Sequence, residues 1–86
     1  MAFVYLRTEV NNENDSGYII NANNIESFFE LVDTDTKKFR VYLINGEGYD
    51  FNQLYYQGKF IYVHTTEQLY SLLTKIERGE IQGESS

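Results

Sequence analysis

The stretch Thr65–Gly79, TTEQLYSLLTKIERG, decides the fold, because every local signal in it predicts an α-helix over residues 66–78. Thr65 is suited to cap the helix N-terminus, and Gln68 three residues later completes a capping box. Gly79 stands where a glycine commonly ends a helix. Apolar residues at helical spacing form a stripe that must be buried, made of Leu69, Leu72, Leu73 and Ile76. We therefore expect one amphipathic helix that covers another layer of the protein.

The segments before this helix predict that layer, since they are short β-branched and aromatic runs separated by polar turns. The clearest strand is Phe39–Ile44, whose alternate residues share one face. Residues 25–32 fit both a strand and a helical spacing, and we favour a strand because the short turn 33–36 leads directly into Phe39–Ile44. Further strands are predicted at 3–6, 17–20 and 59–63, and turns at 11–17, 21–24 and 46–48. Residues 52–58 are expected to form a wide loop or the outer end of a long hairpin.

These elements predict an α+β fold: a small, curled, mainly antiparallel sheet of four to six strands packed by one C-terminal helix. The uncovered face of the sheet would be polar or closed by curling into a small barrel, or the helix would pack on a second subunit. We expect a single globular domain over residues 1–79 and a frayed tail over 80–86, which has one apolar residue, Ile81.

The composition excludes several classes of function. The 86 residues contain no cysteine and one histidine, which excludes a disulfide framework, a thiolate metal site, a cysteine nucleophile and a histidine cluster. Thirteen acidic and seven basic residues give a net charge of −6, which disfavours direct nucleic-acid binding. No run is long and apolar enough for a membrane helix, so we expect a cytoplasmic protein with no membrane contact.

Three patches of the sequence resemble a known family of small proteins. They are Ile20–Phe28, with its asparagine-containing turn and Ile-Glu-Ser strand, the hairpin Leu43–Gly46, and Tyr62–Leu69 at the helix start. This order resembles the FlbD-like family of flagellar and swarming motility, as short patches within residues 19–76. The chain departs from that pattern by its N-terminal strand and loop and by a longer segment between Gly46 and Phe60. The resemblance implies a sheet-plus-helix fold and does not extend to a flagellar function.

No arrangement of side chains in the sequence predicts catalysis, a metal site or a cofactor. His64 directly precedes the helix cap and has no nucleophile near it in the sequence. The acidic pairs Asp33/Asp35 and Glu47/Asp50 fall in turns, where such residues bond local backbone groups. We therefore expect no enzyme activity.

The tyrosines are more informative, because exposed tyrosine is enriched at protein interfaces. The candidates for an interaction site are Tyr49, Phe51, Leu54, Tyr55 and Tyr56. In the competing interpretation this segment folds back as a satellite cluster over the core.

We expect a small non-enzymatic protein-interaction module of phage-borne or accessory type, which binds a protein partner or a second copy as a homodimer. The alternative is an acidic nucleic-acid mimic that inhibits a nucleic-acid-binding protein. A third possibility is a small-ligand binder with a pocket near residues 49–56.

Overall fold

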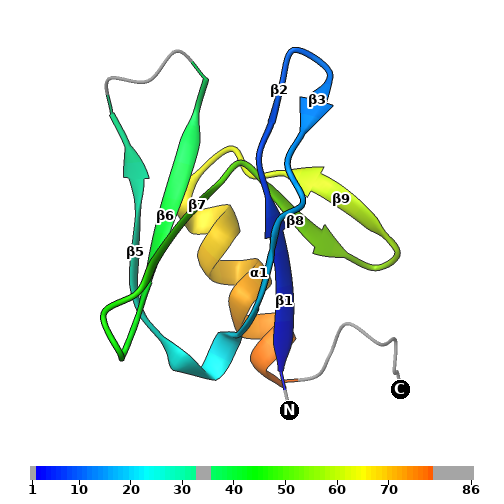
Figure 1. Ribbon diagram of the computed structural model, residues 1–86. Helices are drawn as coiled ribbons and strands as arrows, with labels where there is room; N and C mark the ends of the chain where they lie inside the picture. The colour runs from blue at the N-terminus through cyan, green and yellow to red at the C-terminus, as the bar shows by residue number, and fades with distance from the viewer. Residues whose placement is uncertain (1, 33–35, 79–86) are drawn as a thin grey trace.

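The computed structural model describes residues 2–32 and 36–78 and shows antiparallel strands followed by one helix, which confirms the α+β class (Figure 1). The turn at 33–35, the glycine expected to end the helix and the tail 80–86 lie outside the described residues. In chain order the elements are β1 (Phe3–Arg7), β2 (Glu9–Val10), β3 (Glu13–Asn14), β4 (Tyr18–Asn21), η1 (Ala22–Asn24), β5 (Ile25–Leu31), β6 (Lys38–Leu43), β7 (Gly48–Phe51), β8 (Gln53–Tyr56), β9 (Lys59–Tyr62) and α1 (Thr66–Arg78).

The described strands are divided among three sheets and do not form one continuous sheet. A four-stranded sheet has the order β4-β1-β8-β9, a three-stranded sheet has the order β5-β6-β7, and β2 and β3 form a separate ribbon. All neighbouring strands are antiparallel. Figure 1 shows α1 in the space between the two larger sheets, so that one helix contributes to the packing of both.

The helix and both larger sheets contribute to a single hydrophobic core. Along β6 the side chains of Phe39, Val41 and Leu43 are buried and alternate with partly exposed ones, as a two-residue period requires. The four residues of the helix stripe are all buried, so the predicted amphipathic helix is confirmed. The whole core comprises Ala2, Val4, Leu6, Ile20, Ala22, Phe39, Val41, Leu43, Phe51, Leu54, Val63, Leu69, Leu72, Leu73 and Ile76.

The helix N-terminus is capped much as the sequence predicts. The backbone N–H of Gln68 donates to the Thr65 hydroxyl at 2.9 Å. The Gln68 side chain reaches back and accepts from the backbone N–H of His64 at 2.7 Å, one residue earlier than in an ordinary capping box. His64 therefore contributes to the fold through its backbone.

The ambiguous segment 25–32 is a strand, as favoured from the sequence, because β5 pairs with β6 along its whole length. A register shift between Ile25 and Ser27 marks an irregularity near the start of β5. The predicted turn before it is the 3₁₀ helix η1, where the Asn21 side chain accepts from the Asn23 N–H at 2.9 Å.

The segments 11–17 and 52–58 each contain the turn of a tight hairpin. Asn11 and Asn12 adopt φ angles of 56° and 67°, which form a two-residue turn between β2 and β3. Gln57 and Gly58, at φ 52° and 91°, do the same between β8 and β9. Because this left-handed turn matches the twist of paired strands, the flanking residues pair at once and no wide loop remains. The hairpin alternative for residues 52–58 is thus correct. The loop predicted at 11–17 is wrong at Glu13–Asn14, because these residues form strand β3.

Asn52, between β7 and β8, is the buried polar residue that connects the sheets. Its side chain is 1% exposed and bonds the backbone of Glu9 twice, accepting from the N–H at 2.9 Å and donating to the carbonyl at 2.7 Å. Its own N–H donates to the Arg7 carbonyl at 3.0 Å, and its carbonyl accepts from the Val63 N–H at 3.1 Å. One residue thereby holds together the start of β2, the end of β1 and the end of β9.

Replacing Asn52 by alanine should lower the free energy of unfolding by about 2–4 kcal/mol, because two partly buried backbone groups of Glu9 lose their partners. Urea titration followed by far-UV circular dichroism measures this loss. Asn45→Ala is the matched control, since Asn45 accepts one exposed bond from the Glu47 N–H and should cost under about 1 kcal/mol. Equal losses in the two variants would contradict the central position of Asn52.

Candidate functional site

The outer face of the four-stranded sheet carries a row of apolar and aromatic side chains. Because Val4 and Leu6 point into the core, the alternate residues of β1 point outward. The strand registers place Tyr5 beside Ile19 of β4 and Tyr55 of β8 beside Phe60 of β9. We call the residues Phe3, Tyr5, Ile19, Tyr55 and Phe60 the aromatic face.

The rings of the aromatic face are in contact across three strands. The ring centroids of Tyr5 and Phe60 lie 4.9 Å apart, those of Tyr55 and Phe60 5.1 Å, and those of Tyr5 and Tyr55 6.2 Å. The Arg7 guanidinium lies 3.8 Å from the Phe60 ring centroid, and its Nε donates to the Gln53 side chain at 2.5 Å. The rings are held in place by one another and by this cation.

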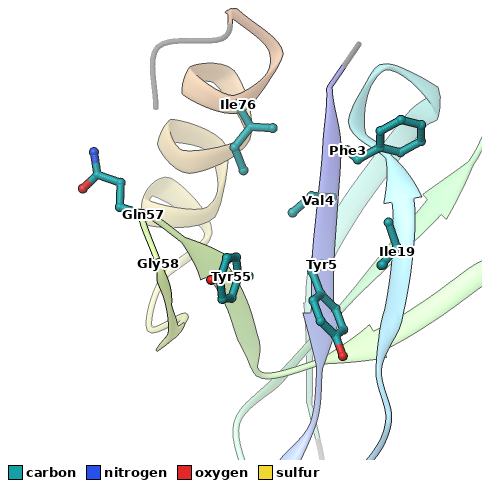
Figure 2. A pocket seen from close by; sticks show the side chains of 8 residues that line it. All are labelled: Phe3, Val4, Tyr5, Ile19, Tyr55, Gln57, Gly58 and Ile76. Atoms are coloured by element: carbon teal, nitrogen blue, oxygen red, sulfur yellow. The ribbon is translucent and has the colours of Figure 1, made fainter. Parts of the chain in front are cut away.

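A groove with a volume of about 410 Å³ opens beside the aromatic face (Figure 2). Phe3, Tyr5 and Ile19 line one side and Tyr55 with Gly58 the other, while Ile76 of the helix contributes from beneath. The groove exists because β1 and β8 pair only at Leu6–Leu54 and Arg7–Gln53. Beyond these pairs the β8–β9 hairpin diverges from β1, as both figures show.

The sheet that bears the groove differs in charge from the rest of the chain. Strands β4, β1, β8 and β9 contain two basic residues, Arg7 and Lys59, and no acidic residue, although the chain has thirteen. Within this sheet Phe3 is 55% exposed, Ile19 66% and Tyr55 43%. Exposed apolar side chains gathered in one place are typical of a binding surface.

The five candidates named from the sequence are divided by the structure. Phe51 and Leu54 are fully buried core residues, so naming them as interaction residues was wrong, and Tyr56 packs partly buried against the core. Tyr55 lines the groove, whereas Tyr49 packs on Tyr18, with ring centroids 4.8 Å apart. The cause is strand alternation, which sends neighbouring residues of β8 to opposite faces of the sheet.

Sequence analysis missed the other members of the aromatic face, because each one fits an ordinary strand. The alternation in Phe3–Arg7 was a usable signal: if Val4 and Leu6 are buried, Phe3 and Tyr5 must face outward. The groove itself has no such local signal, since it depends on how far β8 pairs with β1.

A second, polar surface lies where β4 approaches β7. Here Tyr18, Tyr42, Tyr49, Arg40 and Asp50 line a hollow of about 390 Å³. Arg40 binds Asp50 through two bonds, from Nε to Oδ1 at 2.6 Å and from Nη2 to Oδ2 at 3.1 Å. These bonds lower the pKa of Asp50 and raise that of Arg40.

On the same surface the Tyr49 hydroxyl donates to Glu47 at 2.6 Å, and this bond raises the pKa of the tyrosine. Arg40, Asp50 and Tyr49 of this surface thus already have partners within the protein.

The remaining chemical candidates lie apart from both surfaces. The His64 carbonyl accepts from Lys37 Nζ at 2.7 Å, and Lys37 also pairs with Glu30 at 3.6 Å. Asp33 and Asp35 lie outside the described residues. Over residues 2–32 and 36–78 no three His, Cys, Asp or Glu side chains are grouped so that they could hold a metal ion. The helix in this part of the chain is too short and too polar to cross a membrane.

Comparison with known proteins returned no matching family model, no matching curated protein and no matching solved structure. The FlbD-like resemblance therefore stays a prediction from short sequence patches.

The positions of Tyr55 and Tyr56 predict different costs of substitution. Tyr56→Ala should reduce the free energy of unfolding by about 2–3 kcal/mol because it removes packing against the core, whereas Tyr55→Ala should cost about 1 kcal/mol. Urea titrations of the two single variants test this difference. A larger loss for Tyr55→Ala would show that Tyr55 belongs to the core and not to the groove.

The ion pair of Arg40 and Asp50 predicts a dependence of stability on pH. The carboxyl pKa is lowered from its ordinary 3.8 in the folded state, so the unfolded chain takes up the proton first as pH falls. The stabilisation is therefore complete above about pH 4 and disappears as pH falls through the folded pKa.

Asp50→Asn should accordingly be less stable than the wild type at pH 6 and equally stable below the folded pKa of Asp50. Thermal unfolding at pH values between 2 and 6 measures the difference. Because both side chains are partly exposed, the effect should be small and should shrink in high salt. A difference that is constant over this pH range would contradict the assignment.

Proposed function

We propose that this chain is a small non-enzymatic protein-interaction module that binds its partner through the groove and the aromatic face. The observation that supports this most directly is the apolar groove on a sheet without acidic residues, within a chain of net charge −6. Phe3 and Ile19 are more than half exposed there. Burying such side chains on binding is favourable at roughly 25 cal/mol per Å² of apolar surface.

The chemistry of the groove favours binding over catalysis. Its lining residues are aromatic, aliphatic, glycine and glutamine, and the hydroxyl of Tyr5 already donates to the Ser16 carbonyl at 3.0 Å. A reaction would need a nucleophile, acid or base aimed into the groove, and besides the tyrosine phenols the described lining residues carry no ionisable or nucleophilic side chain. A cytoplasmic location and a phage-borne or accessory role remain predictions from the sequence.

The two alternative functions have less support from the described residues. A nucleic-acid mimic needs free carboxylates along one face, yet Asp50, Glu30 and Glu47 are each bound to a side chain of the protein itself. A small-ligand binder would use the same groove, whose volume lies at the low end of the roughly 300–1,000 Å³ typical of ligand pockets.

The decisive comparison is between Ile19→Lys and Ile44→Lys. The two isoleucines are 66% and 69% exposed, but only Ile19 lines the groove, so the variants place the same charge on different surfaces. Tagged wild type and both variants are used for affinity capture from extracts of the native host, with quantification by mass spectrometry. Circular dichroism confirms that each variant is folded.

We expect a protein captured by the wild type and by Ile44→Lys to be reduced about tenfold or more with Ile19→Lys, since a buried isoleucine contributes roughly 1.5–3 kcal/mol. If every captured protein is retained equally by Ile19→Lys, the groove is not the interaction site. Sedimentation velocity at several concentrations reports whether the partner is a second copy.

A further inference from the structure

The β1 side of the groove is an open strand edge as well as an apolar surface. The Ala22 N–H donates to the Ala2 carbonyl at 2.6 Å, so residue 2 and the alternate residues after it turn their backbone groups toward β4. Phe3 and Tyr5 therefore turn theirs the other way, toward β8. Because Leu6–Leu54 is then a non-hydrogen-bonded pair, the Tyr5 N–H faces the Tyr55 carbonyl, and the groups that open into the groove are those of Phe3 and the carbonyl of Tyr5. The register of β1 with β8 ends at Leu6, so among the described residues no strand pairs with Phe3 on this side.

The opposite side of the groove is also the edge of a strand, β8. In the two-residue turn at Gln57–Gly58 the flanking pair Tyr56–Lys59 is hydrogen bonded, so these residues turn their backbone groups toward each other. By alternation Tyr55 and Gln57 turn theirs toward β1. Two edges of one sheet thus face each other and diverge, with Ile76 beneath them.

We propose that an extended peptide segment of the partner protein enters this groove and adds to the open edge of β1. This inference rests on the proposed function and specifies which kind of segment of the partner protein is bound. Backbone groups in an open edge are satisfied best by an extended chain, which presents N–H and C=O groups at the same spacing. One apolar side chain of the peptide would lie among Phe3, Tyr55 and Ile76, which are apolar or aromatic residues of the groove lining.

Charge further specifies the occupant. Arg7 and Lys59 are the charged residues of the four strands, and the Glu9 carboxylate, which accepts from Gln53 at 3.0 Å, offsets the charge of Arg7. Lys59, two residues after Gln57 of the groove lining, therefore attracts acidic residues that flank the apolar centre of the peptide and repels basic ones. A second copy of the chain fits less well, because the groove of each copy is a concave surface that a narrow extended segment fills better. The occupant is therefore an extended segment with an apolar centre and acidic flanks.

The test uses synthetic acetylated and amidated heptapeptides and the ¹⁵N-labelled full chain observed by NMR. The parent peptide is DTVFVTD, with a panel that replaces the central F by L, V or Y, and KTVFVTK is the charge control. Two further peptides carry N-methyl groups on alternate residues, one in each of the two possible frames. In an added strand only one frame directs its N–H groups toward β1.

We expect an acidic peptide to shift the amide signals of Phe3, Tyr5, Tyr55 and Gly58 and to slow hydrogen exchange at Phe3. N-methylation in one frame should weaken binding about tenfold and in the other frame hardly at all, because only one frame loses backbone hydrogen bonds. KTVFVTK should bind more weakly than DTVFVTD at low salt, and the difference should fall as salt is added. Ile44→Asp should bind the parent as the wild type does, whereas Ile19→Asp, which removes an apolar lining residue and adds a charge that repels the acidic peptide, should not.

Strand addition is overturned if no acidic peptide of the panel binds at 1 mM, or if both N-methylated frames bind as the parent does. It is also overturned if the groove amides shift with protein concentration alone, since the occupant is then a second copy. The proposed function fails separately: loss of a captured protein with Ile19→Lys, without peptide binding, keeps the interaction module and removes only strand addition.

Discussion

The structure depends most on the paired hydrogen bonds between the buried Asn52 side chain and the backbone of Glu9. An asparagine amide has the same donor and acceptor as a peptide group, so Asn52 acts as one residue of an extra strand beside β2. Through its own backbone it also binds Arg7 and Val63. A buried amide is costly unless all its bonds are made, and this one fixes a single arrangement of the junction where three strands meet.

The separation of the sheets and the groove both follow from that junction. The chain turns between β7 and β8 at Asn52, so β7 stays with β6 while β8 joins β1. The junction places the start of β8 beside Arg7, and from there β8 follows β1 for two residue pairs. The hairpin of β8 and β9 then diverges, and the opening that it leaves is underlain by Ile76.

Features governed by local chemistry could be predicted from the sequence, whereas features governed by distant pairing could not. The helix follows from a cap and a stripe within fifteen residues, and the Phe39 strand follows from its alternation. Asn52 looked like a loop residue because its partner lies more than forty positions earlier. The site was predicted only at Tyr55, since Phe51 and Leu54 had the right residue types for an interface but the wrong face of a strand.

The aromatic face is not needed to complete the core, which gives it a different significance from the buried aromatic residues. Phe39 and Phe51 fill space between the helix and the sheets and have no exposed surface, whereas the rings on the outer face are in contact with one another and still leave Tyr55 exposed. Such ring pairs stabilise a sheet by roughly 0.5–1.5 kcal/mol each, yet a solvent-facing sheet is stable with polar residues there. Arg7 lies over Phe60, and the four strands of this sheet contain no acidic residue of their own, although the Glu9 carboxylate of β2 accepts from Gln53 at 3.0 Å. A face whose rings hold one another in place and whose strands contain no acidic residue is suited to close contact with another protein.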